Sequence, residues 1–190
     1  MFSQMRISTG LLQNRMLFPE AFKNAFLKMV EENDYSVKRE KTIAQLALYH
    51  QKTIATLDNE VFFRGTPNAN NSNMQNSFIR PEDEHFLIIG VTVMDGNNAS
   101  VQATDWDYGA NLQPVKAGQI SITTNGVRVL KDMPLTEADP DLTTSDHGVI
   151  TLGEPIFWGG QNDLVVEYTS PVAGAVADNL RIGLVGIGLI

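Results

Sequence analysis

The stretch "QISITTNGVRVL", residues 119–130, gives the clearest indication of fold in this chain. Ile120 and Ile122 alternate with polar residues before the dipeptide Asn125-Gly126, and alternating valines follow the dipeptide. Asn-Gly is a preferred centre of a two-residue hairpin turn, since both positions tolerate the positive φ that such a turn needs. The stretch therefore predicts an antiparallel β-hairpin.

The β pattern extends over everything from residue 80 onward. Three more stretches are rich in β-branched and apolar residues and are separated by turn-forming Gly, Asn and Asp: "HFLIIGVTVMD" (85–95), "GVITLGEPIFWGGQNDLVVEYTS" (148–170) and "NLRIGLVGIGLI" (179–190). Together they predict about seven strands at the short spacing that is typical of a sandwich or barrel. We therefore expect a mainly β protein with an antiparallel β-sandwich over residues 80–190.

The stretch 179–190 is unusual because both of its alternating sets are apolar. The sets are Leu180, Ile182 and Leu184 on one side and Gly183, Val185 and Ile187 on the other. One face of a sandwich strand lies in the core, so a strand that is apolar on both faces needs a cover on its outer side. That cover would be the N-terminal region or a second subunit. Glycines at 183, 186 and 188 would let a neighbouring group approach closely.

The first sixty residues have a helical pattern. In "PEAFKNAFLKMVEEN" (19–33), apolar residues recur at helical spacing and Pro19 suits a first turn. A second amphipathic helix is expected from about residue 34 to 57, which would make a helical hairpin. Such a hairpin must bury its apolar stripes against the β domain or a neighbour. The candidate interface residues are Phe22, Phe26, Met29, Ile43, Leu46 and Ile54 of the two helices, with Val185 and Ile187 of the last strand.

Three regions follow from these patterns. Residues 1–60 are expected to form an N-terminal arm and helical hairpin, and residues 80–190 the β-sandwich. Between them, residues 61–79 hold a short apolar stretch and "TPNANNSNMQNS", in which Asn occupies five of twelve positions. Asn, Pro and Ser favour turns, so we expect a strand followed by an Asn-rich linker.

Composition narrows the classes of function. The chain of 190 residues has no cysteine, which excludes disulfides, thiolate metal sites and cysteine nucleophiles. Its net charge of −8 is uneven: residues 1–60 carry eight Lys/Arg and seven Asp/Glu, residues 61–190 six and fifteen. The acidic β domain is therefore not expected to bind nucleic acid directly. No apolar run is long enough to span a membrane. Polar residues interrupt the N-terminal segment where a signal peptide would need an apolar stretch, so we expect synthesis in the cytoplasm without signal-directed export.

No motif for catalysis stands out. There is no Gly-x-Ser-x-Gly, and His50, His85 and His147 are isolated in the sequence, so we interpret them as a helix-face, a strand-edge and a turn residue. We expect no enzymatic activity, no cofactor and no metal ligand set. The acidic stretches "DWDYG" (105–109) and "TEADPDLTTSDHG" (136–148) could supply oxygen ligands to a cation, although neither has the spacing of a calcium loop. Solvated turns explain them equally well.

Trp106 and Tyr108 lie in the polar stretch 105–109 and admit two interpretations. Exposed aromatic rings can stack on sugars, in which case the two residues would form a ligand-stacking platform in a carbohydrate-binding or adhesion module. Single aromatic residues more often serve packing and interfaces, in which case Trp106 would close a loop over the edge of the sandwich.

Four stretches taken in order carry a family resemblance: "RPEDEHFLIIGVTV" (80–93), "ISITTNGVRVLKDMPL" (120–135), "GEPIFWGGQNDLVVEYT" (153–169) and "NLRIGLVGIGLI" (179–190). In strand rhythm and turn style they resemble virion structural proteins of bacteriophages that use a single jelly roll. The resemblance implies a jelly-roll-like sandwich and a non-enzymatic structural protein of the virion. Its partners would be further copies of itself, as a homo-oligomer, and other virion proteins of a capsid or its associated components. The alternative is the carbohydrate-binding or adhesion module.

Overall fold

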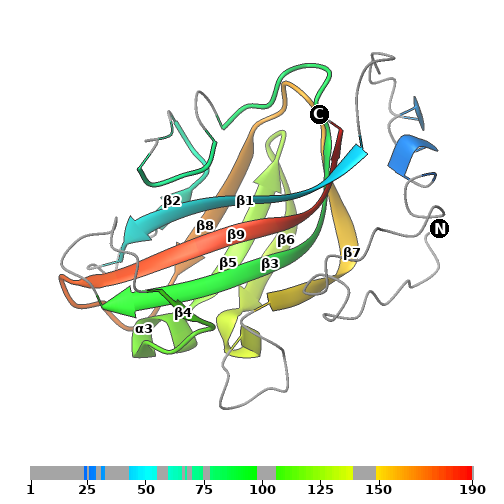
Figure 1. The fold of residues 1–190 in the computed structure, drawn as a ribbon. Coiled ribbons are helices and arrows are strands. Elements are labelled where there is room, and N and C mark those ends of the chain that lie inside the picture. Colours follow the sequence, from blue (N-terminus) through cyan, green and yellow to red (C-terminus); the bar gives the residue numbers. More distant parts are fainter. Residues whose placement is uncertain are drawn as a thin grey trace.

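A computed structural model describes residues 24, 26–28, 31–32, 43–54, 60–65, 67, 70–74, 78–97, 106–138 and 149–189. These residues form two antiparallel sheets that pack face to face (Figure 1). The first, five-stranded sheet has the order β1-β9-β3-β4, and β7 also pairs with β3. The second, four-stranded sheet has the order β2-β8-β5-β6. The prediction of a mainly β, antiparallel two-sheet protein is confirmed.

The elements have the following bounds. The first sheet contains β1 (Ile43–Thr53), β3 (Phe86–Asn97), β4 (Asp107–Tyr108), β7 (Val149–Trp158) and β9 (Asp178–Leu189). The second sheet contains β2 (Glu60–Phe62), β5 (Gln119–Thr124), β6 (Val127–Pro134) and β8 (Leu164–Thr169). A short helix α3 (Gln113–Lys116) and a 3-10 helix η1 (Leu135–Ala138) lie near one end of the sheets (Figure 1).

The strands pair in a nested way. The first strand pairs with the last, β1 with β9, and the second with the second-last, β2 with β8. Further inward β3 pairs with β7, and β5 pairs with β6 in a hairpin. Only the two-residue β4, which extends the edge of β3, lies outside this nesting among the described strands. In addition β9 pairs with β3, and β8 pairs with β5, so these pairs are joined into the two sheets.

The predicted hairpin at 119–130 is confirmed. Strands β5 and β6 meet at Asn125 and Gly126, whose φ angles of 49° and 72° are the positive values that the turn requires. Strands β3, β5, β6, β7, β8 and β9 lie in the stretches where strands were expected after residue 80, whereas the short β4 lies in a stretch that was expected to be a loop. Ile120 and Ile122 point into the core, where Trp158 is the largest of the fully buried side chains.

The second predicted helix is wrong where the structure describes it. Residues 43–53 form strand β1, which pairs with β9 along its entire length, from Ile43 opposite Leu189 to Thr53 opposite Asn179. The segment is rich in Ala, Leu, Gln and Lys, which favour helices locally, but pairing with a buried central strand outweighs a propensity of a few tenths of a kcal/mol per residue. The sheets therefore include residues 43–53, well before residue 80.

Only part of the first predicted helix lies within the described residues. Residues 24, 26–28 and 31–32 have helical backbone. Phe26 is fully buried, and its ring centroid lies 6.4 Å from that of Phe157 on β7. Phe22 and Met29 lie outside the described residues. Phe26 thus supplies one of the covers that the apolar outer side of the sheet needs.

The two-faced character of the last strand is confirmed. Leu180, Ile182 and Leu184 belong to the core between the sheets, whereas Ile187 is buried outside that core cluster. The glycines on β9 permit close contacts within the chain. A Cβ atom on Gly186 would lie 1.9 Å from the carbonyl oxygen of Leu87 on the neighbouring strand β3.

Candidate functional site

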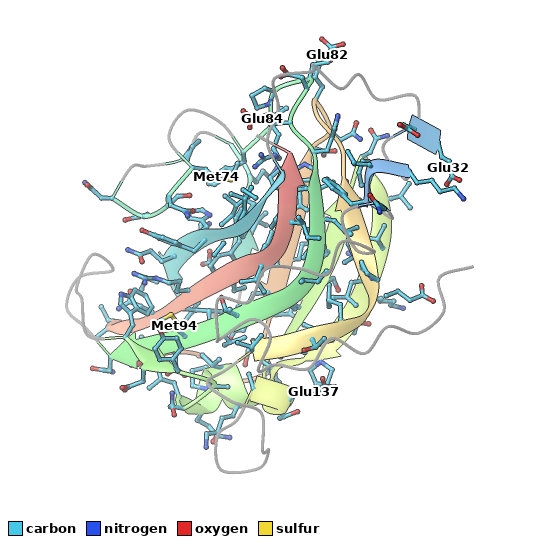
Figure 2. The ribbon with its side chains drawn as sticks, turned by 45° about the vertical axis from the view of Figure 1, so that its right-hand side comes forward. Glu32, Met74, Glu82, Glu84, Met94 and Glu137 are labelled. Atoms are coloured by element: carbon cyan, nitrogen blue, oxygen red, sulfur yellow. The ribbon has the colours of Figure 1, made fainter. Side chains whose placement is uncertain are left out.

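A row of side chains crosses the outer face of the first sheet near one end. The strand registers place Gln51 of β1 opposite Arg181 of β9, Arg181 opposite Met94 of β3, and Met94 opposite Tyr108 of β4. Alternation along β9 puts Arg181 on the side away from the core residues Leu180 and Ile182. Figure 2 shows Met94 at this end of the sheet, far from Glu82 and Glu84 at the other.

Two aromatic rings flank the arginine in this row. The Cζ atom of Arg181 lies 4.6 Å from the ring centroid of Tyr49 and 4.4 Å from that of Trp106. Such distances are those of cation–π contacts. The guanidinium also donates two hydrogen bonds to Oε1 of Gln51, at 2.8 Å from Nε and 2.5 Å from Nη2. We call Tyr49, Gln51, Met94, Trp106, Tyr108 and Arg181 the Arg181 cluster.

The cluster holds a positive charge that no carboxylate of the described residues neutralises. Arg181 is partly buried and forms no ion pair with the described residues. Burial lowers the pKa of Arg181 below its ordinary value, and the nearby Tyr49 and Tyr108 oppose this change. An arginine in such a place is costly to desolvate and gains from an anionic partner.

Asp95 fixes the segment that follows Tyr108. Its carboxylate is buried and accepts hydrogen bonds from the backbone N–H groups of Asn111 at 2.6 Å and Leu112 at 2.7 Å, and from the Asn111 side chain at 3.0 Å. Burial raises the pKa of Asp95, and these hydrogen bonds oppose the rise. Since Gly109 also donates its N–H to the carbonyl of Val93 at 2.9 Å, the β4 segment with its aromatic residues is tied to β3.

The Asn-rich segment closes the other side of the cluster. Asn73 acts like a neighbouring strand, because its Oδ1 accepts from the N–H of Tyr49 at 2.8 Å and its Nδ2 donates to the carbonyl of Ala47 at 2.7 Å. The N–H of Gln51 donates to the carbonyl of Asn71 at 2.9 Å. This segment was expected to be a linker. Where it is described, it satisfies the free edge of β1 and so fixes Tyr49 and Gln51.

The two predicted stacking residues do lie together, but in different surroundings. Tyr108 is 57% exposed, whereas Trp106 is partly buried with Arg181 against its ring. The Nε1 atom of Trp106 is buried and has no acceptor among the described residues. Tyr108 is therefore the more accessible of the two rings.

The predicted interface residues divide into three groups. Ile54 and Leu46 pack in or against the core between the sheets, so their apolar side chains are covered by the chain itself and not by a partner. Ile187 and Phe26 are buried on the outer side of the first sheet, and Val185 on the same side is partly exposed. Ile43 begins β1, and nothing is described of its side chain.

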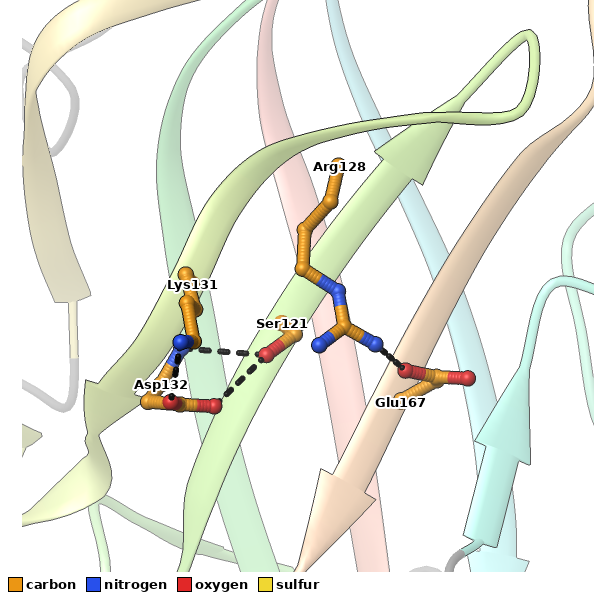
Figure 3. A network of polar contacts seen from close by, with 5 residues as sticks. All are labelled: Ser121, Arg128, Lys131, Asp132 and Glu167. Carbon is orange, nitrogen blue, oxygen red and sulfur yellow. Dashed lines mark hydrogen bonds and ion pairs between the residues drawn. The ribbon is translucent and has the colours of Figure 1, made fainter.

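The outer face of the second sheet is different in character. Arg128 of β6 forms an ion pair with Glu167 of β8, and Ser121 of β5 donates to Asp132 at 3.2 Å and accepts from its N–H at 3.0 Å (Figure 3). The charges on this face are therefore paired. The Arg181 cluster, on the outer face of the first sheet, has an arginine that forms no ion pair with any residue the structure describes.

Two histidines act as buried hydrogen-bond acceptors. Nδ1 of His50 accepts the N–H of Phe63 at 3.0 Å, and Nδ1 of His85 accepts the N–H of Gly160 at 3.0 Å. Because His50 lies on β1 and faces inward, its assignment to a helix face is wrong. Burial, and to a lesser extent Lys52, lowers the pKa of His50 to about 4. His147 lies outside the described residues, in which no group of three His, Asp or Glu side chains is arranged to hold a metal ion.

Comparison with known proteins identifies no relative. No protein-family model, curated protein or solved structure matches the chain. No helix in the described part of the chain is both long enough and apolar enough to cross a membrane.

Sequence reasoning found Trp106 and Tyr108 but missed Arg181, Tyr49 and Gln51. One signal was available for Arg181, which is the only charged residue in the apolar stretch 179–190. A single charge in such a strand must lie on the outer face or find a partner. Tyr49 and Gln51 could not be found, since their segment was expected to be helical.

Proposed function

We propose that this chain is a non-enzymatic structural protein of a bacteriophage particle and that it assembles through contacts with its own copies and with other virion proteins. We further propose that its two sheets form a jelly roll. The nested pairing of β1 with β9, β2 with β8, β3 with β7 and β5 with β6 supports this finer assignment. Jelly rolls of eight strands in two sheets are common in viral capsids.

The observation that carries the proposal of assembly is the difference between the two outer faces. The second sheet has paired charges outside, such as Arg128 with Glu167. The first sheet has aromatic residues, an arginine that pairs with no carboxylate among the described residues, and an apolar region that Phe26 helps to cover. Tyrosine, tryptophan and arginine are the residues most enriched at the energetic centres of protein interfaces. The first sheet is therefore the favoured assembly face.

The free energy needed for copies of the chain to associate is modest. A specific interface buries about 1,600 Å² in total, and apolar burial is worth about 25 cal/mol per Å², less the cost of ordering side chains and of association. A few well-packed rings can thus decide whether copies associate. Because β1 and β2 belong to the sheets, assembly must be tested on the full chain and not on one that begins near residue 80.

The test is the native mass of the full chain, measured by light scattering on a size-exclusion column over a range of concentrations. We expect a closed oligomer. The matched variants are Tyr108→Ser on the first sheet and Val127→Ser at the β5–β6 turn, since both side chains are strongly exposed, at 57% and 63%. Tyr108→Ser should weaken the oligomer and Val127→Ser should not. A wild-type chain that stays monomeric at every concentration would refute self-assembly.

The virion assignment has a separate test. Quantitative mass spectrometry of purified particles made by the genome that encodes the chain should find it in many copies per particle. Its absence from such particles, together with oligomers in solution, would leave assembly in place and remove the virion role.

A carbohydrate-binding or adhesion module is the second candidate, and one observation favours it. The ring of Tyr108 is exposed beside Trp106 at the end of the sandwich. On a glycan array, the wild-type chain would bind a defined class of sugar, and Trp106→Ala would lose binding while keeping its fold. The stacking of Arg181 on Trp106 argues against a free platform, so we place this function second.

A further inference from the structure

Arg181 has unused hydrogen-bonding capacity within its cluster. A guanidinium has five N–H groups. Two of them, one on Nε and one on Nη2, donate to Oε1 of Gln51. The remaining ones, including both on Nη1, have no acceptor among the described residues. The edge formed by Nη1 and Nη2 can therefore still bind a carboxylate with two parallel hydrogen bonds.

The surroundings of Arg181 also fix its plane. The rings of Tyr49 and Trp106 lie 4.6 Å and 4.4 Å from its Cζ atom, and Gln51 holds one edge. An arginine that is already oriented loses less side-chain freedom when it binds, which favours tight and specific pairing.

A purely structural role for Arg181 does not explain why it differs from Arg80 and Arg128. Arg80 is buried more deeply than Arg181 and contacts Oε2 of Glu84 at 3.0 Å. Arg128 on the second sheet is paired with Glu167. Arg181 is partly buried, and yet within the described part of the chain its acceptor is a neutral amide oxygen. A carboxylate from outside the chain would pair with this charge and offset part of the cost of its desolvation.

We infer that the Arg181 cluster is a receptor for a carboxylate side chain of a second copy of this chain. The inference rests on the proposed self-assembly and names the contact that drives it. The charge of the chain supports a second copy as the source. Residues 61–190 carry fifteen acidic residues and six basic ones, and Glu82, Glu154 and Asp163 are among the acidic residues exposed on the described surface. Each copy can therefore offer carboxylates to the arginine of the next.

The experiment compares Arg181→Gln with Arg128→Gln in the full chain. Each variant removes one arginine charge from an outer face, but only the first removes the receptor. Sedimentation equilibrium gives the dissociation constant of self-association, and circular dichroism with urea unfolding verifies that each variant is folded. Loss of a central interface residue weakens association by about thirtyfold or more. We expect that loss for Arg181→Gln and an unchanged constant for Arg128→Gln.

A second variant protects the test against misfolding. Gln51→Glu keeps the shape of the side chain and places a carboxylate on Arg181 from within the chain, at the price of the hydrogen bond from Nε2 to the carbonyl of Asn70 at 3.1 Å. It should block self-association although Arg181 is still present. Sodium glutamate should also dissociate the wild-type oligomer more than sodium chloride at equal ionic strength, because glutamate competes for the arginine.

The outcomes separate this inference from the function on which it rests. If the wild-type chain associates and both Arg181→Gln and Gln51→Glu associate equally well, the receptor is refuted while self-assembly stands. If the wild-type chain is monomeric at every concentration, self-assembly itself is refuted, and the receptor with it. If glutamate and chloride act alike, general screening explains the salt effect and the carboxylate site is overturned.

Discussion

Lowering the pH should unfold this protein partly through one buried histidine. His50 is 7% exposed and lies among the rings of Phe62, Phe63 and Phe78, at centroid distances of 5.7, 5.9 and 4.8 Å. Its Nδ1 accepts the N–H of Phe63, so a proton on Nδ1 would set two N–H groups against each other. Burial and the nearby charge of Lys52 lower the pKa of His50 from 6.5 to about 4.

The direction of the pKa change determines whether folding stability rises or falls as the pH is lowered. In the unfolded chain the imidazole takes up a proton near pH 6.5, whereas in the folded chain it does so only near pH 4. The unfolded state therefore binds more protons between these values, and folding stability falls as the pH is lowered through this window. The difference between the two pKa values corresponds to about 3 kcal/mol, which is a large part of the stability of an ordinary domain.

The assay is urea unfolding of the full chain at several pH values from 7.5 to 4, followed by tryptophan fluorescence. The comparison is with His50→Asn, since Oδ1 of asparagine can take the place of Nδ1 and accept the N–H of Phe63. The variant will be less stable at every pH because ring contacts are lost, but it should lack the histidine contribution to the slope. We expect the wild-type chain to lose about 3 kcal/mol more than the variant over this window. Parallel pH profiles for the two proteins would refute the reasoning, because the acid sensitivity would then come from carboxylates.

Three further substitutions test the packing that supports the candidate site. Gly186→Ala should destabilise the fold by about 2 kcal/mol or more, because the new Cβ would lie 1.9 Å from the carbonyl oxygen of Leu87, a buried backbone group that cannot move aside. Gly153→Ala is the control and should be nearly neutral, since nothing lies within 4 Å of its new Cβ. Equal urea midpoints for the two variants would contradict this prediction. Phe26→Ala should cost about 3 kcal/mol in thermal unfolding if its burial is part of the native fold, and an unchanged Tm would show that it is not. Asn73→Ala should cost about 1 kcal/mol and increase aggregation by opening the edge of β1, which light scattering on heating would detect; unchanged aggregation would show that the edge is protected in another way.

The sequence contained more information about the strands after residue 80 than about those before it. The Asn125-Gly126 turn and the alternation on β9 are local signals, since each depends on residues that are adjacent in the chain. Strand β1 could not be predicted in this way, because its residues favour a helix locally and become a strand only by pairing with β9 at the other end of the sequence. For the same reason Tyr49, which lies on β1, could not be predicted as part of the candidate site.

The position of Arg181 allows an experiment to separate folding stability from the self-association that we propose. Side chains alternate across a strand, so Arg181 lies on the outer face of the sheet while Leu180 and Ile182, one residue away on either side, lie in the core. A change at Arg181 should therefore remove the proposed contact between copies without opening a cavity in the core, whereas a change at Ile182 would lower stability as well. The informative result is thus a folded Arg181→Gln chain with a near-normal urea midpoint and a weakened oligomer. A large loss of stability in that variant would instead mean that the arginine, held by Tyr49 and Trp106, mainly fixes the outer face of its own sheet.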